Sequence, residues 1–410
     1  MAELLMHDLY TQEDAEIVFV GASRYYRGID PEVVDRYTNK KSLNIGSSAQ
    51  TTKDTYYMLK EMFKTNSPKY VVIDVNRRRL YDIEKLMSSQ ALISNTKMST
   101  NKISWLTSIH NYEDYYNALF PGFFRATPEY IFSKEPSKNI KQKTNKRYRE
   151  YDYDFFNTKQ NAYKGRGYIY TERQYKEGQT GKKGASEQWD VREVHEDKLV
   201  WLEKAVELCY QHDAKVLFAS MPVAYGNMHG NYQNYLDYAN AYSQQLGIDF
   251  ADFNLVKKSK FQRKDTYFYD RHHMNVYGSE LFGETFGQYI RDDLNGSLKK
   301  EEYLHSTFQE LLDDSPFLFS TWYEYDEVAG DIKAHYNSGT IKNGVEYQYS
   351  YNTKEDKEYK VYREYSSSPY GEVDKLPEDV HQIKLETREV NSGEEEPQFF
   401  IGSVRKFLDN

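Results

Sequence analysis

Residues 15–23 read AEIVFVGAS, an apolar and β-branched run that ends in glycine, alanine and serine. A run of this kind bounded by turn residues predicts a buried β-strand. Similar runs cover residues 69–75 (KYVVIDV) and 214–220 (AKVLFAS), and a shorter one, KSLN, ends at Asn44. Helical periodicity follows each of them, so the sequence predicts an α/β fold with a parallel sheet.

The organisation changes twice along the chain. Residues 85–190 are polar, rich in Tyr and Lys, and carry the turn signals KGRGY and EGQTGKKG, which favours an irregular insertion or cap. An insertion at the strand ends of such a sheet commonly shapes the ligand crevice, and a cap without substrate contact is the alternative. From about residue 315 the strand pattern alternates in six segments, which predicts a small antiparallel β-sandwich. We therefore expect an α/β domain over residues 1–300 and an accessory β-sandwich over 315–410.

The composition limits the kinds of molecule that we expect this protein to bind. The formal net charge is -9, and a surface of that sign repels a phosphate backbone, so nucleic acid is not an expected partner. The single cysteine, Cys209, excludes an internal disulfide and a thiolate metal site. The 40 tyrosines suit stacking on sugar rings, although a biased composition in which they pack inside the protein explains them equally well.

The sequence shows no signal peptide and no apolar stretch of about 18 residues that would span a membrane. Its first 20 residues, MAELLMHDLYTQEDAEIVFV, reach a strand almost at once. This start is what we expect of a chain that follows a membrane anchor.

Three side chains supply the parts of a hydrolytic serine site. Ser23 follows the first strand in GAS, where Gly21 permits the sharp turn that exposes a hydroxyl at the sheet edge. Asp270 and His273 stand three residues apart, so on a helical or tight-turn backbone the carboxylate reaches Nδ1 and leaves Nε2 facing the serine. The alternative for Ser23 is an ordinary turn between a strand and a helix.

Four sequence blocks in order resemble the SGNH, or GDSL-like, hydrolase superfamily. They are GAS at 21–23, NIG at 44–46, DVN at 74–76 and DRHHMN at 270–275. The resemblance covers about residues 15–295 and implies a flavodoxin-like α/β domain with a Ser-His-Asp triad. Within the superfamily, the spellings GASR, NIGSSAQ and HHMNVYG are more similar to the membrane-anchored partners of membrane-bound O-acyltransferases. These include alginate and cellulose O-acetylation proteins and the D-alanyl transfer protein of teichoic acid operons.

The resemblance assigns roles to residues of this chain. Ser23 would be the nucleophile, His273 the general base and Asp270 the carboxylate that orients it. The oxyanion hole would use the Ser23 backbone, the Gly46 N–H and the Asn76 side chain.

Other residues near these blocks have two interpretations. The third block continues as NRRR, so Arg77 is an alternative to the asparagine, which could instead cap the strand. Arg24 and Tyr25 follow the serine and could orient a substrate, or Arg24 could lie on the surface. His272 beside His273 suggests a metal, but adjacent residues point apart and no third ligand has fitting spacing, so no metal or other cofactor is expected.

These observations lead to a functional expectation. The leading hypothesis is an extracytoplasmic polysaccharide O-acetyltransferase on the cell-surface side of a bacterial membrane, acting through an acyl-enzyme. An acetylesterase with the same mechanism and a non-catalytic glycan-binding protein are the alternatives. By resemblance, the partners would be a cell-surface or secreted polysaccharide and a membrane-bound O-acyltransferase, with membrane contact only through an anchor outside this sequence.

Overall fold

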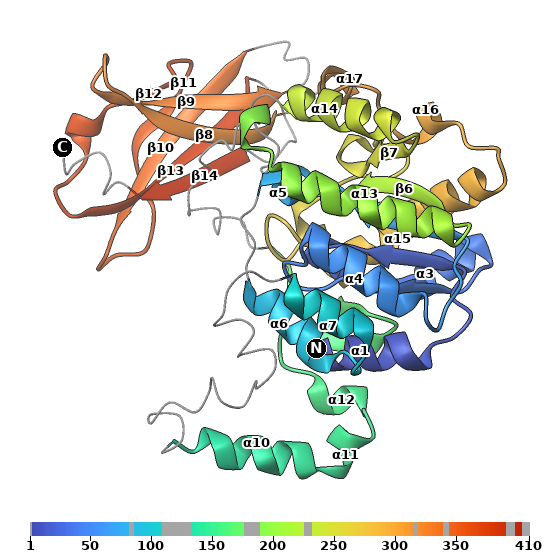
Figure 1. Cartoon of the computed structure of the whole chain (residues 1–410). Helices are drawn as coiled ribbons and strands as arrows, with labels where there is room; N and C mark the ends of the chain where they lie inside the picture. Colours follow the sequence, from blue (N-terminus) through green and yellow to red (C-terminus); the bar gives the residue numbers. More distant parts are fainter. Residues whose placement is uncertain are drawn as a thin grey trace.

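A five-stranded parallel sheet forms the centre of the first part of the protein (Figure 1). The computed structural model describes residues 2–81, 86–108, 133–175, 189–224, 232–314, 318–338, 344–390 and 398–403. The sheet order is β2-β1-β3-β6-β7, and its strands are β1 (Ile17–Val20), β2 (Ser42–Asn44), β3 (Tyr70–Asp74), β6 (Lys215–Ser220) and β7 (Asp249–Asp252). All neighbouring pairs are parallel, which confirms the predicted α/β class. The order is that of a flavodoxin-like sheet, in which the strand order reverses between β1 and β3.

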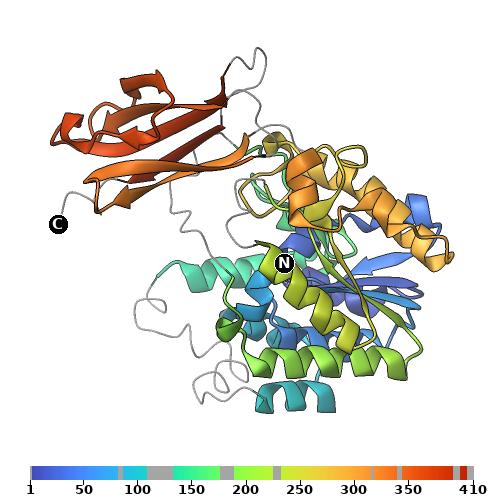
Figure 2. The ribbon, with the colours of Figure 1, turned by 90° about the horizontal axis from the view of Figure 1, so that it is seen from above.

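The strands are apolar on both faces because helices cover both sides. In β1, Val18 and Val20 pack into one hydrophobic cluster, while Ile17 and Phe19 pack into the other. The first cluster includes residues of helices α4 (Thr52–Met62), α13 (Glu196–Gln211) and α14 (Tyr232–Gln245). The second includes residues of α3 (Pro31–Thr38) and α15 (Val276–Leu294). Figure 2 shows these helices on opposite sides of the sheet.

Local capping signals fix where two of the helices begin. The Asp30 side chain accepts a hydrogen bond from the Glu32 N–H ahead of Pro31, as the Asp-Pro pair predicts for the start of α3. At α4, the Thr51 hydroxyl accepts from the Asp54 N–H and the Asp54 carboxylate accepts from the Thr51 N–H. This capping box satisfies two donors at the helix start and holds its first turn rigidly above the sheet edge.

The described part of the 85–190 segment is more regular than expected. It contains α6 (Leu86–Asn95), α7 (Thr100–Thr107), α10 (Glu135–Thr144), α11 (Lys146–Arg149) and α12 (Tyr153–Phe156), then a hairpin of β4 (Ala162–Gly165) and β5 (Tyr168–Tyr170). The KGRGY signal forms the hairpin turn, where Gly165, Arg166 and Gly167 all have positive φ. The EGQTGKKG signal lies outside the described residues.

The first residues form a helix, α1 (Ala2–Thr11), instead of leading directly into a strand. Leu5, Met6 and Leu9 of this helix are buried in the first hydrophobic cluster. The apolar spacing of these residues is therefore explained by packing against the α/β core.

Two antiparallel sheets form the carboxyl-terminal part, as predicted. They contain β8 (Leu318–Asp326), β9 (Asp331–Ser338), β10 (Val345–Thr353), β11 (Lys360–Ser366), β12 (Tyr370–Gly371), β13 (Val380–Glu389) and β14 (Gln398–Ser403). The orders are β11-β10-β13-β14 and β12-β9-β8, and side chains of both sheets share one core that includes Tyr349, Ile332 and Leu385. Two short helices, α16 (Lys300–Tyr303) and α17 (Phe308–Asp314), precede these strands. Figure 1 shows the strands gathered at one side of the α/β part.

Candidate active site

The candidate site lies at the carboxyl ends of β1 and β3, where ligands of doubly wound sheets bind. Ser23 is the first residue of the short helix α2 (Ser23–Gly28), two residues after Gly21. A Cβ atom on Gly21 would lie 2.3 Å from the Cβ of Asp74, so only glycine fits between these strand ends. The close approach of β1 and β3 thus places the serine hydroxyl beside the groups that follow β3.

Ser23, His273 and Asp270 lie within hydrogen-bonding distance of one another. Ser23 Oγ is 2.6 Å from His273 Nε2, although 250 residues separate them in sequence. His273 Nδ1 is 2.9 Å from each carboxylate oxygen of Asp270. The structure therefore brings together the three side chains that the sequence analysis singled out.

Hydrogen bonding fixes which nitrogen of His273 carries the hydrogen. Burial by itself would raise the pKa of Asp270, but the hydrogen bond and charge of His273 and the His272 N–H bring it below its ordinary value. An ionised carboxylate only accepts, so Nδ1 of His273 carries the hydrogen and Nε2 accepts from the Ser23 hydroxyl. This is the arrangement in which the imidazole can remove the serine proton.

The imidazole is also held mechanically. Asp270 Oδ1 accepts from the N–H groups of His272 and His273, which closes a tight turn between the two triad residues. The Tyr269 ring stacks on the His273 ring at 5.3 Å and an interplanar angle of 13°, and the Arg27 guanidinium lies over the Tyr269 ring at 4.7 Å. These contacts restrict rotation of the base and keep Nε2 aimed at the serine.

Of the three residues expected to supply oxyanion donors, Ser23 and Asn76 line the same cavity. The Ser23 N–H is at the start of α2, where the helix offers it no acceptor. Asn76 Nδ2 donates to Asp74 Oδ1 at 2.8 Å, and its second hydrogen has no described acceptor. Gly46 differs from the expectation, because its N–H donates to Asn44 Oδ1 at 3.0 Å and the residue lines a different cavity. The structure thus offers Ser23 and Asn76, rather than Gly46, as donors toward the site.

Replacing Asn76 tests the donor role. In this role Asn76 would donate a hydrogen bond to the developing oxyanion, so we expect kcat of Asn76→Ala for an acetate ester to fall roughly 100- to 1,000-fold with little change in KM. Steady-state kinetics check this, with Asn295→Ala on the exposed end of α15 as a control. A loss confined to KM would contradict the role.

The side chains around the serine form a cavity of ≈250 Å³. Arg24 lines it, as the sequence analysis allowed. Tyr25 is not among the residues that line it, because its ring is fully buried and its hydroxyl donates to the Ala219 carbonyl oxygen. Arg77 is also not among the lining residues, whereas Arg78 and Arg79 are.

Further lining residues were not expected from sequence: Ser48, Gln50, Thr51, Thr52 and Lys198. The polar segment NIGSSAQTTKD gave a partial signal, since it leads into a helix start at the sheet edge. Nothing in the sequence indicated Lys198, because this residue reaches the cavity from α13, more than 100 residues further along the chain.

His272 lies in the cavity beside the triad. Within the described residues, no three or more His, Cys, Asp or Glu side chains are grouped to hold a metal ion. Burial, with the charges of Arg24 and Arg78, lowers the pKa of His272 to about 2. His272 is therefore neutral near neutral pH.

The low pKa of His272 leads to a prediction about the pH dependence of activity. A group that protonates only near pH 2 cannot produce the acidic limb of the activity profile, so His272→Gln should leave the position of that limb unchanged. The pH dependence of kcat/KM for the two proteins checks this. A displaced limb in the variant would show that His272 titrates during turnover.

Among the residues that the structure describes, no helix has the length and apolar character needed to cross a membrane. No protein-family model and no curated protein match the chain. The solved structures with similarity include a protein of the lipolytic G-D-S-L family from Desulfitobacterium hafniense, at 11% identity and a TM-score of 0.31 over 67% of this chain and 98% of that one.

Two further similarities have comparable scores. A GDSL-like lipase from Bacteroides thetaiotaomicron is 12% identical, with a TM-score of 0.28 over 70% of this chain and 90% of that one. A two-domain esterase active on acetylated mannans is 10% identical, with a TM-score of 0.30 over 97% of this chain and 93% of that one. These similarities concern architecture, and the chemistry of the present site rests on its own side chains.

Proposed function

We propose that this chain is a serine-dependent acyl-transfer enzyme of the SGNH type. One observation carries the proposal: Ser23 Oγ, His273 and Asp270 form a continuous hydrogen-bonded chain at one end of a cavity. A serine with an adjacent base, and a base oriented by a carboxylate, is the arrangement that activates a hydroxyl for attack on a carbonyl carbon.

In the first half of the reaction, Ser23 Oγ attacks the ester carbonyl carbon and its proton passes to His273 Nε2. The Ser23 N–H and Asn76 Nδ2 stabilise the negative charge that develops on the carbonyl oxygen. The C–O bond to the alcohol then breaks, His273 returns the proton to the departing oxygen, and the acyl group remains on Ser23.

In the second half, an incoming hydroxyl attacks the acyl-enzyme while His273 Nε2 accepts its proton. The Ser23–acyl bond breaks and the serine regains its hydrogen from the imidazole. If the incoming hydroxyl belongs to a sugar, the product is a new ester; if it belongs to water, the product is an acid. The same side chains serve both outcomes, and exclusion of water decides between them.

We further propose that the acyl group is acetyl and that the acceptor is a cell-surface polysaccharide. The spellings GASR, NIGSSAQ and HHMNVYG, which resemble polysaccharide O-acetylation proteins, support this assignment. In this proposal, a membrane-bound O-acyltransferase supplies the acetyl group on the extracytoplasmic side. The β-sandwich would bind glycan or hold that partner.

An acetylesterase is the second candidate, and exposure of the triad favours it. The His273 side chain is 18% exposed and Asp270 40%, so water can reach an acyl-enzyme in the isolated chain. A separate glycan-acceptor site would have to be filled before transfer could compete with hydrolysis.

One experiment separates these activities. The chain is incubated with an activated acetate ester and neutral or acidic oligosaccharides, and the products are analysed by mass spectrometry. Acetylated oligosaccharide that requires Ser23 supports transfer, whereas rapid release of acetate without acetylated sugar supports an esterase. Absence of both, together with glycan binding, would leave a non-catalytic binding protein and reject the proposal.

A further inference from the structure

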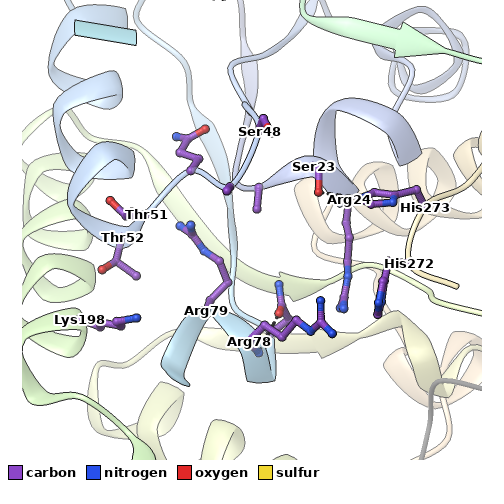
Figure 3. A pocket seen from close by; sticks show the side chains of 14 residues that line it. Ser23, Arg24, Ser48, Thr51, Thr52, Arg78, Arg79, Lys198, His272 and His273 are labelled. Atoms are coloured by element: carbon purple, nitrogen blue, oxygen red, sulfur yellow. Dashed lines mark hydrogen bonds between the residues drawn. The ribbon is translucent and has the colours of Figure 1, made fainter. Parts of the chain in front are cut away.

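The wall of the active-site cavity is strongly cationic. Four basic side chains, those of Arg24, Arg78, Arg79 and Lys198, line the ≈250 Å³ cavity. Among the described residues that line it, none carries a carboxylate. Figure 3 shows Ser23 and His273 at one side of the hollow, with Lys198 and Arg79 toward the other. This is unusual in a chain whose formal net charge is -9.

One buried carboxylate lies close to this wall. Asp74 lies behind the wall, with Oδ2 3.9 Å from Arg79 Nε. Its oxygens also accept from the Ala22 N–H and from Asn76 Nδ2, so this carboxylate is shared among several donors. Among the described residues that line the cavity, the basic side chains therefore set the sign of the local potential.

The titration of neighbouring groups agrees with that potential. Burial and the nearby Arg78 lower the pKa of Arg24, although Asp74 opposes this effect. The same two arginines contribute to the low pKa of His272. Positive charges thus repel one another in the cavity, and an anion placed there would relieve the repulsion.

Uncharged donors without partners also line the cavity. Gln50 is 1% exposed, and neither its Nε2 nor its Oε1 has a hydrogen-bond partner among the described residues. Thr52 is 2% exposed, and its hydroxyl also has no hydrogen-bond partner among the described residues. Leaving such groups buried and unpaired costs free energy that a ligand would recover.

The start of α4 adds to the same wall. Thr51 and Thr52, its N-cap and first helical residue, line the cavity beside Gln50. The N-terminal end of a helix carries partial positive charge and amide hydrogens that favour an anion. Cationic side chains, unpaired amide and hydroxyl groups, and a helix start therefore converge on one volume.

We propose that this wall is an anion subsite, so that the ester cleaved or formed at Ser23 belongs to a substrate that carries a carboxylate or a phosphate. The inference rests on the proposed acyl-transfer function and specifies its substrate class. Because Ser23, His273 and the cationic wall line one small cavity, the anionic group lies on the same sugar unit as the ester or on the next one.

Matched substrates test this directly. Methyl glycosides with one O-acetyl group are compared in three forms: a glucuronide with a carboxylate, a glucoside with a neutral hydroxymethyl group, and a glucoside 6-phosphate. We expect kcat/KM to be roughly tenfold or more higher for an anionic form than for the neutral one, since charge-assisted hydrogen bonds are the stronger kind. The preference should shrink at high salt, and the better of the two anions distinguishes a uronate from a phosphorylated sugar.

Substitutions locate the effect. In Lys198→Gln and in Arg78→Gln, the anionic preference should fall severalfold, while turnover of the neutral ester changes less. Lys299→Gln, which removes an exposed charge before α16, is the control and should keep the full preference. Circular dichroism and thermal melting show whether each variant is folded. If Lys198→Gln does not fold, Arg78→Gln tests the same prediction.

Binding gives an independent readout. Calorimetry with Ser23→Ala measures the affinity for methyl glucuronide, methyl glucoside and its 6-phosphate without turnover. Tighter binding of an anionic sugar that weakens in Lys198→Gln supports the subsite. Ser23-dependent turnover with equal kcat/KM and equal affinity for neutral and anionic forms would overturn the subsite while preserving the function. Loss of all Ser23-dependent turnover would instead reject the function.

Discussion

Ser23→Ala should reduce the turnover of an acetate ester by roughly 10,000-fold or more, to the level that binding and the oxyanion donors alone provide. The substitution removes the atom that attacks, and His273 Nε2 then faces no hydroxyl at 2.6 Å. Ser23 is only partly buried and does not belong to either hydrophobic cluster, so the thermal unfolding temperature should change little. Steady-state kinetics and thermal melting measure the two effects separately.

A covalent probe makes this result specific. A fluorophosphonate should label the wild-type chain at a single site, and peptide mass spectrometry should place the label on the peptide with Ser23. Ser137→Ala in the exposed helix α10 is a matched control and should keep both labelling and turnover. If Ser23→Ala kept activity within about tenfold of the wild type, Ser23 would not be the nucleophile.

Much of the fold follows from local patterns in the sequence. The apolar runs that become β1, β3 and β6 are buried on both faces, so their composition alone identifies them. The strand β7 (Asp249–Asp252) was missed because DFAD has too few apolar residues to signal a strand. Its place in the sheet comes from parallel pairing with β6, which is a tertiary contact.

The candidate site was predictable where spacing along the chain sets the geometry. Asp270 and His273 are joined by one tight turn, and Ser23 follows a strand whose end is visible in the sequence. The choice among Arg77, Arg78 and Arg79 was not predictable, because it depends on how the short helix α5 (Arg77–Tyr81) is rotated against its neighbours. Likewise, the loss of Gly46 as a donor depends on the Asn44 side chain, which folds back onto that N–H.

The anion subsite shows a second limit of sequence reasoning. Its parts come from the segment after β2, the turn after β3 and the start of α13. Each part alone has an ordinary explanation as a helix start or a solvated charge. Only the parallel order of the strands brings them to one edge of the sheet, where their charges add.

Asp270→Asn is the second substitution with a large expected effect, and its reason lies in the tautomer of His273. Asp270 Oδ1 accepts from the backbone N–H groups of His272 and His273, so the asparagine carbonyl oxygen should keep that position. The amide nitrogen would then replace Oδ2, which lies 2.9 Å from Nδ1, and as a donor it favours the tautomer with the ring hydrogen on Nε2. An imidazole in that form cannot accept the Ser23 proton, and we expect kcat to fall about 10,000-fold.

Nitrogen NMR of the histidine ring reads the tautomer itself and so distinguishes this explanation from simple loss of packing. In the wild type, Nδ1 of His273 should carry the hydrogen, and in Asp270→Asn it should move to Nε2. Asp314→Asn is the matched control, since it replaces the carboxylate that lies 3.0 Å from His305 Nε2 elsewhere in the protein and should leave kcat unchanged. Combining Ser23→Ala with Asp270→Asn should cost little beyond Ser23→Ala alone, because the carboxylate acts only through the serine it helps to activate. Additive losses in the double variant would mean that Asp270 serves a step in which Ser23 takes no part.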